Sequence, residues 1–240
     1  MPAAGAGWPS LCAVCHGWGR GRVCLDCVQR FGARVPRCTR CALQVPVAVA
    51  MGVAVCGACL TAPPPFERSV AAVDYGYPWD SLITRFKFHA ALDLAPALAH
   101  RLAQAVVDHD ATAPTLPTLL LPVPLSAARL RERGYNQAWE LTRHLGRLRQ
   151  CPVDARLLLR VKDTAHQLAL PLAQRAGNVR GAFAIEPGRR AELQQRHVAL
   201  IDDVMTTGAT AAEITRVLLQ AGAAQVQVWT VARTPRPPHA

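Results

Sequence analysis

The residues most able to do chemistry in this chain lie in one short segment, VALIDDVMTTGAT, at residues 198–210. An apolar run leads into two adjacent carboxylates, Asp202 and Asp203, and a turn rich in threonine and glycine follows. The start of a helix after such a turn offers free backbone N–H groups that can hold an anion. The two carboxylates would repel a phosphate, but they can accept hydrogen bonds from vicinal hydroxyls or help hold Mg2+. The segment therefore predicts a site for a phosphorylated ribose.

Other phosphate-binding motifs do not fit the sequence. The chain has no GxxxxGK[ST] loop, and its glycine-rich stretch at residues 17–21 lies between cysteine pairs instead of after a strand. Asp202 and Asp203 could also be acids that cap a helix after a core strand. Capping does not require the threonine-glycine turn, so we favour the ligand site.

A second group of residues predicts metal binding. Eight of the nine cysteines precede residue 60 and form four CxxC pairs, while Cys151 stands apart. Two thiolates separated by two residues can reach one tetrahedral metal ion, so four pairs predict two structural zinc sites. The expected ligands are Cys12, Cys15, Cys24, Cys27, Cys38, Cys41, Cys56 and Cys59.

Several alternatives to this zinc module remain open. An iron–sulfur cluster would use the same thiolates, whereas disulfides need an oxidising compartment and a redox CxxC would not recur four times. Sequential pairing of the cysteines is the simplest arrangement, and a crossed one is compatible with the spacing. His16 could replace a cysteine ligand. The arginines among the pairs could contact nucleic acid or solvate a small module; they are Arg20, Arg22, Arg30, Arg34, Arg37 and Arg40.

The elements that must position the carboxylates alternate between strands and helices. The apolar runs at residues 118–123 and 198–201 predict strands buried on both faces, and residues 157–161 and 226–232 predict two more. Apolar periodicity predicts helices at residues 79–88, 92–107, 138–148 and 211–221. This alternation predicts an α/β fold with a mostly parallel sheet flanked by helices.

Composition shifts give the expected domain organisation. The proline-rich stretch TAPPPF at residues 61–66 marks a boundary. We expect a small cysteine-rich zinc-ribbon module at residues 1–62, a linker at 63–67, the α/β domain at 68–234 and a disordered tail at 235–240.

The net charge of the chain and its lack of targeting signals limit which partners and locations are expected. The chain has 27 Lys and Arg residues against 16 Asp and Glu residues, and only Lys87 and Lys162 are lysines. Arginine suits phosphate because its planar fork donates two parallel hydrogen bonds, although codon bias in a GC-rich genome would give the same surplus. The sequence shows no secretory signal and no membrane span, so we expect a cytoplasmic protein.

With these residues in view, the chain resembles a known family. The segment at residues 198–210 resembles the 5-phosphoribosyl-1-pyrophosphate (PRPP) signature of type I phosphoribosyltransferases, which are glycosyltransferases. The whole chain resembles the ComF family, a competence-associated group that includes ComFC-like and GntX-like proteins. The resemblance rests on the cysteine pairs, PVPLS at residues 122–126, RLRERGYNQ at 129–137, Gln167, Arg175, Asn178 and GAF at 181–183.

The resemblance implies a type I phosphoribosyltransferase fold with a hood, and a role for each site residue. Asp202 and Asp203 would contact the ribose hydroxyls. The 5-phosphate would be held by Thr206, Thr207, Gly208, Ala209 and Thr210. The pyrophosphate loop would be Val123, Pro124, Leu125 and Ser126. Arg129 and Arg133 would face the pyrophosphate from one helix face, unless they are merely solvated. Residues 162–180 would form a flexible loop that brings Arg160, Lys162 or Gln167 onto developing charge.

The implied activity is transfer of a 5-phosphoribosyl group with release of pyrophosphate, assisted by Mg2+. Purine-salvage enzymes have an acidic base where this chain has Thr206, so 6-oxopurine salvage is doubtful and the acceptor is open. The role would lie in DNA uptake and natural competence or in nucleotide metabolism. The alternative is a non-catalytic accessory protein that binds PRPP and single-stranded DNA or the DNA-uptake machinery, and a homodimer is one assembly it could form.

Overall fold

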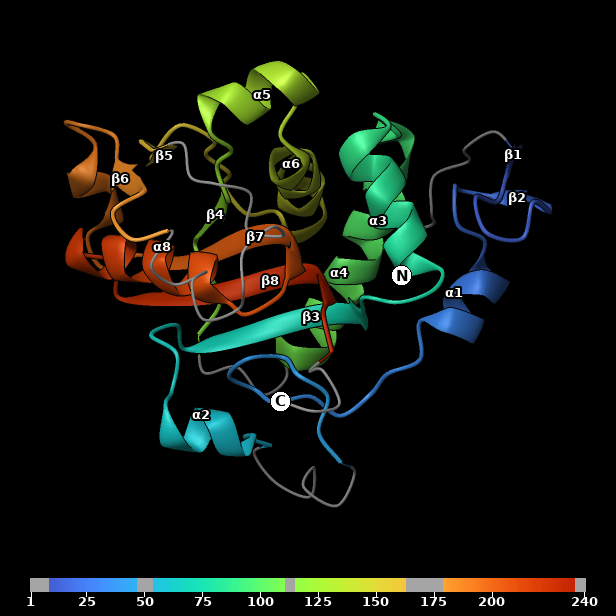
Figure 1. Ribbon diagram of the computed structural model, residues 1–240, viewed down its shortest axis with the longest axis horizontal. Helices are drawn as coiled ribbons and strands as arrows, with labels where there is room; N and C mark the ends of the chain where they lie inside the picture. The colour runs from blue at the N-terminus through green and yellow to red at the C-terminus, as the bar shows by residue number, and fades with distance from the viewer. Residues whose placement is uncertain (1–8, 47–53, 111–114, 163–178, 236–240) are drawn as a thin grey trace.

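A four-stranded parallel sheet forms the centre of the molecule (Figure 1). The computed structural model describes residues 9–46, 54–110, 115–162 and 179–235. The strands are β3 (Arg68–Asp74), β4 (Leu119–Pro122), β7 (His197–Met205) and β8 (Gln225–Arg233), and their order across the sheet is β3-β8-β7-β4. All three pairings are parallel, so the carboxyl ends of the strands meet at one edge.

Both faces of the sheet are buried, which explains why its strands are continuous apolar runs. Along β7, Ala199 and Ile201 belong to one apolar cluster, whereas Val198 and Leu200 belong to the other. This alternation follows from the two-residue repeat of a strand, whose successive side chains point to opposite faces.

Three helices cover the first face: α3 (Trp79–Phe88), α4 (Ala95–Asp110) and α6 (Gln137–Arg149). The predicted helix at residues 92–107 is divided, because a 3-10 turn at Leu92–Leu94 precedes α4. Its four expected inward residues, Leu94, Leu98, Leu102 and Val106, are all fully buried.

The second face is covered by α8 (Ala209–Gln220), whose Ile214 and Leu218 are fully buried. As expected, a glycine follows the helix: Gly222 has a positive φ of 108°, which ends the helix. Beside α8 lies an antiparallel ribbon of β5 (Leu158–Arg160) and β6 (Phe183–Ile185). A short 3-10 turn, Arg190–Leu193, leads from this ribbon towards β7.

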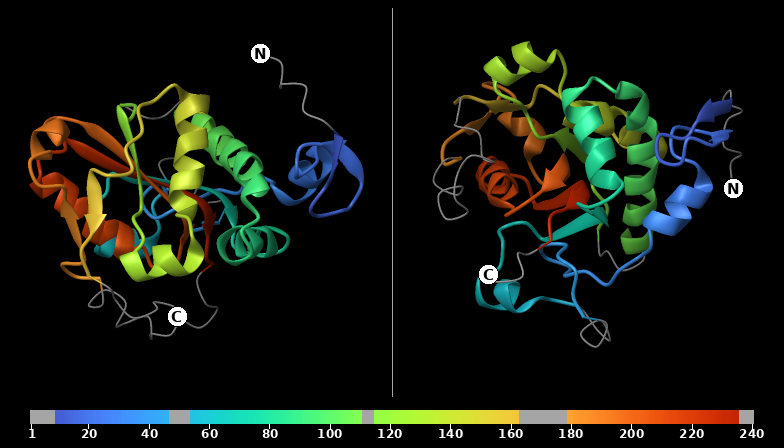
Figure 2. Two further views of the ribbon diagram at one scale, coloured as in Figure 1. Left: turned by 90° about the horizontal axis from the view of Figure 1, so that it is seen from above. Right: turned by 45° about the vertical axis from the view of Figure 1, so that its right-hand side comes forward.

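The cysteine-rich segment reaches two separate places on this body (Figure 2). Its first part, with β1 (Pro9–Leu11), β2 (Trp18–Arg20) and α1 (Leu25–Phe31), packs against α3 and α4. Trp79 Nε1 donates to the carbonyl of Phe31 at 2.8 Å, which fixes the end of α1 to α3. The second part, with α2 (Gly57–Thr61), lies beside β3, where Ser69 Oγ donates to the carbonyl of Arg40 at 2.8 Å.

The predicted fold class is confirmed: a mostly parallel sheet with flanking helices follows a cysteine-rich segment, as in the type I phosphoribosyltransferase fold. Four of the described strands, β1, β2, β3 and β6, were not predicted. β7 continues four residues beyond the predicted end, because it pairs with β8 as far as Met205 and Arg233. Asp202 and Asp203 therefore lie within the strand.

Some predictions concern residues outside the described parts of the chain. Most of the expected flexible loop at 162–180, including Gln167, Arg175 and Asn178, is among them, and so are residues 236–240 of the expected tail. The domain bounds stay a prediction, and Phe66, within the expected linker, is 2% exposed. No helix of the described residues is long and apolar enough to cross a membrane.

Candidate functional site

The carboxylate pair lies near the carboxyl end of β7, where open parallel sheets commonly bind ligands. Asp203 is 2% exposed, and its Oδ2 lies 2.9 Å from Nζ of Lys87 on α3. The contact has ion-pair distance without hydrogen-bond alignment, so this buried oxygen has no hydrogen-bond partner among the described residues. Asp202 is half-buried, and its Oδ1 accepts the backbone N–H of Asp203 at 2.9 Å.

The surroundings shift the pKa values of the two carboxyl groups in opposite directions. Burial and the neighbouring charge of Asp203 raise the pKa of Asp202 well above its ordinary value. Burial alone would raise the pKa of Asp203 too, but the charge of Lys87 and a hydrogen bond from Asp202 outweigh burial and lower it. For Lys87, burial is outweighed by the charges of Asp203 and Asp202, and its pKa is raised. The surroundings therefore favour the ionised form of Asp203, beside Lys87, and the protonated form of Asp202.

Sequence reasoning missed Lys87. The residue lies 116 positions before Asp203, so no motif joins them, and only the packing of α3 on the sheet brings them together. One signal was available: Lys87 is one of just two lysines in a chain whose other basic side chains are arginines. Lysine is a compact point charge that pairs with a single carboxylate oxygen, whereas arginine presents a planar fork.

The predicted phosphate turn leads directly from β7 into α8. Gly208, with φ 79°, occupies the left-handed region at the N-cap of α8. Because Gly208 has no side chain, the N-cap residue itself supplies no side-chain cap to α8. The N–H of Ala209 donates to Thr207 Oγ1 at 3.3 Å, and Thr207 is exposed. The turn thus combines a helix N-terminus with hydroxyl groups open to a ligand.

The predicted pyrophosphate loop lies beside this turn. The N–H of Val123 donates to the carbonyl of Ile201, the residue before the carboxylate pair, at 2.9 Å. Asn136 Nδ2 donates to the carbonyl of Val123 at 3.1 Å, which fixes the loop from the other side. Pro124 and Leu125 are half-buried, and Ser126 is the N-cap of α5 (Ala127–Arg133). Both loops therefore meet at the same edge of the sheet.

The predicted basic residues differ in their placement. Arg129 and Arg133 both lie on α5. The guanidinium of Arg133 stacks on the ring of Phe88 at 5.0 Å and donates to Gln137 Oε1 at 2.5 Å, which places it beside the end of α3 that carries Lys87. Lys162 is exposed beside Gly181, at the start of the predicted flexible loop. The N–H of Gly181 donates to Glu213 Oε1 of α8 at 2.7 Å, so the base of that loop is tied to the helix that begins at the phosphate turn.

Two hollows among the described residues have volumes of about 320 and 210 Å3. Neither is lined by residues of the segment from Asp202 to Thr210. The candidate site therefore lies apart from both hollows.

The eight predicted metal ligands form two groups, each with its sulfur atoms within 4.8 Å of one another. The first group is Cys12, Cys15, Cys24 and Cys27, and the second is Cys38, Cys41, Cys56 and Cys59, so the pairing is sequential. Zinc held at about 2.3 Å from four sulfurs separates them by about 3.8 Å. The Sγ atoms of Cys15 and Cys24 are 3.7 Å apart, and those of Cys41 and Cys56 are 3.6 Å apart.

The two groups are built alike. The residue after the second cysteine, His16 or Ala42, has positive φ and closes a tight turn by donating its N–H to the carbonyl of Cys12 or Cys38. The N–H groups of Cys24 and Cys56 each donate to the Sγ of the first cysteine at 3.3 Å. N–H donors of this kind stabilise thiolates, so both groups fit structural zinc.

Most arginines of the cysteine-rich segment contact the protein itself. Arg22 pairs with Asp93, Arg34 with Asp108 and Arg37 with Asp74, at 2.5, 2.5 and 2.7 Å. Arg40 Nη1 donates to the carbonyl of Glu67 at 2.9 Å. Much of the local positive charge thus fixes this segment to the α/β body.

Comparison with solved structures finds several phosphoribosyltransferases. The glutamine PRPP amidotransferase of B. subtilis has a TM-score of 0.39 and 17% identity, over 61% of this chain and 30% of its own length. The HGPRT-ase of Leishmania tarentolae has a TM-score of 0.32 and 16% identity, over 59% of this chain and 68% of its own. Likenesses this weak add nothing to the fold, which rests on the sheet order and the two loops.

Sequence comparison is more decisive, although no family model matches the chain. DNA utilization protein YhgH of Salmonella typhimurium is 36% identical over 233 residues, which cover 94% of this chain and 98% of the relative. The Escherichia coli K12 protein of that name is 35% identical over 230 residues, with the same coverage. Competence protein F of Haemophilus influenzae is 38% identical over 179 residues, or 74% of this chain and 78% of the relative. The chain belongs to the ComF family, together with DNA utilization protein YhgH and competence protein F.

Proposed function

We propose that this protein binds PRPP at the edge formed by β7 and the loop before α8, and transfers its 5-phosphoribosyl group to a nitrogen acceptor. The observation that carries the proposal is the arrangement of Asp202 and Asp203 directly before a glycine turn that opens α8. A phosphorylated ribose has vicinal hydroxyls to donate to the carboxylates and a phosphate to occupy the helix N-terminus.

The buried oxygen of Asp203 supports this assignment. Its Oδ2 has an ion-pair neighbour in Lys87 but no aligned hydrogen-bond donor among the described residues. A ligand hydroxyl that donates to this carboxylate would add a hydrogen bond to the ion pair with Lys87.

The proposal also assigns roles to the remaining predicted residues. The loop from Val123 to Ser126 would receive the pyrophosphate, with Arg133 and Arg129 supplying positive charge from α5. Lys162, at the start of the predicted flexible loop, would approach the reacting centre when that loop closes. Thr206, Thr207 and Thr210 would donate hydroxyl hydrogen bonds to the 5-phosphate.

The reaction forms one bond and breaks one. The nitrogen of the acceptor attacks C1 of the ribose, and the bond from C1 to the pyrophosphate oxygen breaks with its electron pair leaving on pyrophosphate. The acceptor nitrogen gives up its proton to solvent. The chain's own residues position the two reactants and stabilise the developing charge. Mg2+, held by the carboxylate of Asp202 together with ligand oxygens, would supply neutralisation of the leaving group.

The test is a titration of PRPP with Mg2+ by calorimetry, repeated with candidate bases while released pyrophosphate is assayed. Saturable binding with pyrophosphate release supports the transferase. Binding without release from any acceptor favours an accessory protein that keeps the ligand site and not the chemistry. No binding at all contradicts the proposal.

A second candidate function is single-stranded DNA binding in DNA uptake or use. The names of the relatives, DNA utilization protein and competence protein F, point to it. One local feature supports it: Trp18 is 77% exposed on β2, and the exposed Arg20 lies two residues further on the same strand. Residues two apart share a face of a strand, so an aromatic platform and a cation lie together, as proteins that bind single strands require.

Fluorescence titration with single-stranded oligonucleotides at low and physiological salt tests this candidate. If it is right, affinity falls steeply with salt, and Trp18→Ala weakens binding by about tenfold, the loss of one stacked base. Tyr77→Ala is the matched control, because Tyr77 is also exposed, at 69%, but belongs to the loop before α3. The absence of binding at both salt concentrations would contradict it.

A further inference from the structure

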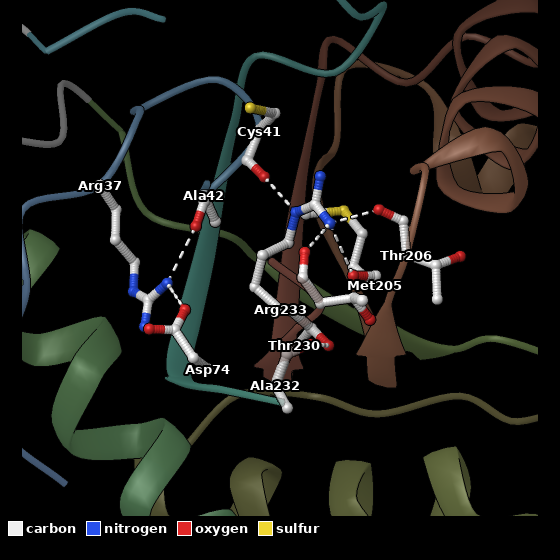
Figure 3. A network of polar contacts seen from close by, with 10 residues as sticks. Arg37, Cys41, Ala42, Asp74, Met205, Thr206, Thr230, Ala232 and Arg233 are labelled. Carbon is white, nitrogen blue, oxygen red and sulfur yellow. Dashed lines mark hydrogen bonds and ion pairs between the residues drawn. The ribbon is translucent and has the colours of Figure 1, made fainter. Parts of the chain in front are cut away.

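Arg233, the last residue of β8, joins the second cysteine group to the proposed phosphate turn (Figure 3). Its Nε donates to the carbonyl of Cys41 at 2.8 Å. Its Nη1 donates to the carbonyls of Met205 and Thr206, the first of these at 3.0 Å, and to that of Thr234 at 2.8 Å. One guanidinium thus holds a metal-ligand residue with one nitrogen and the start of the turn with another.

The buried positive charge of Arg233 needs a negative partner, and we infer that the second cysteine group supplies it. The residue is 5% exposed, and no carboxylate of the described residues lies within ion-pair distance of it. Buried charges are normally paired, since an isolated one is costly. Four thiolates around one Zn2+ carry a net charge of −2, which would compensate a guanidinium bonded to one of the ligand residues.

The second cysteine group is also rigidly attached to the sheet. Arg37 pairs with Asp74 at the end of β3 at 2.7 Å and donates to the carbonyl of Ala42 at 3.1 Å. The N–H of Ser69 on β3 donates to the carbonyl of Thr39 at 3.0 Å. Ala42 also belongs to the same apolar cluster as Met205, which leads into the turn. The group is therefore a fixed support for the turn and not a separate lobe.

Within the part of the chain that the structure describes, the first cysteine group has no such connection to the turn. Its contacts lead to α3, α4 and the 3-10 turn before α4, for example from Arg22 to Asp93 and from the carbonyl of Phe31 to Trp79. Both groups consist of two CxxC pairs with the same local hydrogen bonds, but only the second is joined to the turn by a side chain among the described residues.

We propose that metal occupancy of the second cysteine group sets the conformation of the Met205–Gly208 turn through Arg233, so that loss of this metal, and not of the first, weakens phosphoribosyl-ligand binding. This inference rests on the proposed function for its effect on ligand affinity. Its structural part, the order of the turn, does not depend on the identity of the ligand. Arg233 acts as a positioning residue, because its guanidinium donates to the carbonyl side of the turn and leaves the N–H groups for the ligand.

The chain offers a closely matched pair of variants, Cys24→Ser and Cys56→Ser. Both cysteines are the third ligand of their group, both are half-buried, and both are the N-cap of a short helix, a position that serine also favours. Each variant of the full chain is assayed for zinc content, for hydrogen exchange of the amides of residues 206–209 and for PRPP affinity by calorimetry. We expect each to lose about one zinc. Faster exchange and PRPP binding weakened by about tenfold, the worth of one or two hydrogen bonds, are expected for Cys56→Ser alone.

Arg233→Lys and Arg233→Met keep all eight cysteines and test the bridge itself. Lysine keeps the charge but has one nitrogen, which cannot serve both the Cys41 carbonyl and the carbonyls of the turn. We expect both variants to retain two zinc ions and to show the fast exchange and weak binding of Cys56→Ser. Thermal melting reveals whether each variant folds. If one does not, zinc is partly removed from the wild-type chain instead, and hydrogen exchange of the turn amides is measured on that sample.

The outcomes separate this inference from the proposed function. If the wild-type chain does not bind PRPP, the proposed function fails, and the exchange of the turn still tests the coupling. If the wild type binds, but Cys56→Ser and Arg233→Lys leave both exchange and affinity unchanged, the coupling is wrong. Equal effects of Cys24→Ser and Cys56→Ser would also overturn it.

Discussion

Lys87 Nζ lies 2.9 Å from Oδ2 of Asp203, although the two residues belong to different layers of the fold. Asp203 is almost completely buried, whereas Lys87 retains partial contact with solvent. The charge balance of the candidate site therefore depends on how α3 packs on the sheet.

Replacing Lys87 with methionine should destabilise the fold by about 2 kcal/mol, because it leaves a buried carboxylate without its cation. The measurement is urea unfolding at neutral pH. A double-mutant cycle with Asp203→Asn is the control: once the carboxylate is neutral, Lys87→Met should cost much less. Additive effects of the two changes would mean that the ion pair has no energetic role.

Asp202→Asn should stabilise the free protein at neutral pH. The pKa of Asp202 is raised well above its ordinary value, first by burial and then by Asp203. A carboxyl whose folded pKa lies above its unfolded pKa costs stability once both states are ionised, and it costs nothing below the unfolded pKa. The gain in melting temperature should therefore be largest at neutral pH and above, and should vanish in acid.

Asp154→Asn provides the opposite control. Burial would raise the pKa of Asp154, but the hydrogen bond from Arg189 at 2.5 Å and two backbone N–H groups outweigh it and lower the pKa. A lowered folded pKa contributes stability above the unfolded pKa, and this contribution is lost as pH falls through the folded pKa. Asp154→Asn should thus reduce the melting temperature at neutral pH. A loss of stability for Asp202→Asn at neutral pH would contradict the assigned environment of the pair.

The purified chain should contain two zinc ions, since each group of four sulfurs has the separation that one tetrahedral ion requires. Elemental analysis checks the number and identity of the metals. Complete removal by a chelator should lower the melting temperature, because the cysteine-rich segment has few large apolar residues with which to build a core. Iron, or zinc sufficient for one site only, would overturn the double zinc site.

Gly208→Ala should cost about 1 kcal/mol of stability, since φ at this position is 79° and a Cβ is strained there. It should also weaken PRPP binding, because the backbone of the turn must shift. Gly188→Ala is the matched control: its φ is 82°, a Cβ there meets nothing within 4 Å, and it is distant from the turn in sequence. If both variants lose similar stability but only Gly208→Ala binds PRPP more weakly, the result supports the turn as the phosphate site. Equal PRPP affinity of the two variants would count against it.

Much of the fold was predictable because the strands are buried on both faces. The apolar runs around Leu120 and Leu200 identified β4 and β7, and the periodic leucines of α4 are all fully buried. β3 was not predicted, although it is buried along almost its whole length, because its apolar run is a short stretch of valine and alanine between polar residues. The predicted end of β7 was wrong. Aspartate has a low strand propensity, but hydrogen bonding with β8 continues the strand through both Asp202 and Asp203.

The site could be predicted only where its residues are close in sequence. Asp202, Asp203 and the glycine turn form one motif, and the CxxC spacing identified the eight ligands. The sequential grouping was the simplest arrangement, but only the structure distinguishes it from a crossed one. Lys87 and Arg233 had no such signal, because their partners lie far along the chain and depend on how layers pack. The attachment of the second cysteine group to β3 was invisible for the same reason.

The most direct test of the account is a calorimetric titration of PRPP with Mg2+ into the wild-type chain and into the variant with both Asp202→Asn and Asp203→Asn. Thermal melting first establishes that the variant is folded. The account predicts saturable binding by the wild type and none by the variant. Equal affinity in the two proteins, or no binding by the wild type, would contradict it.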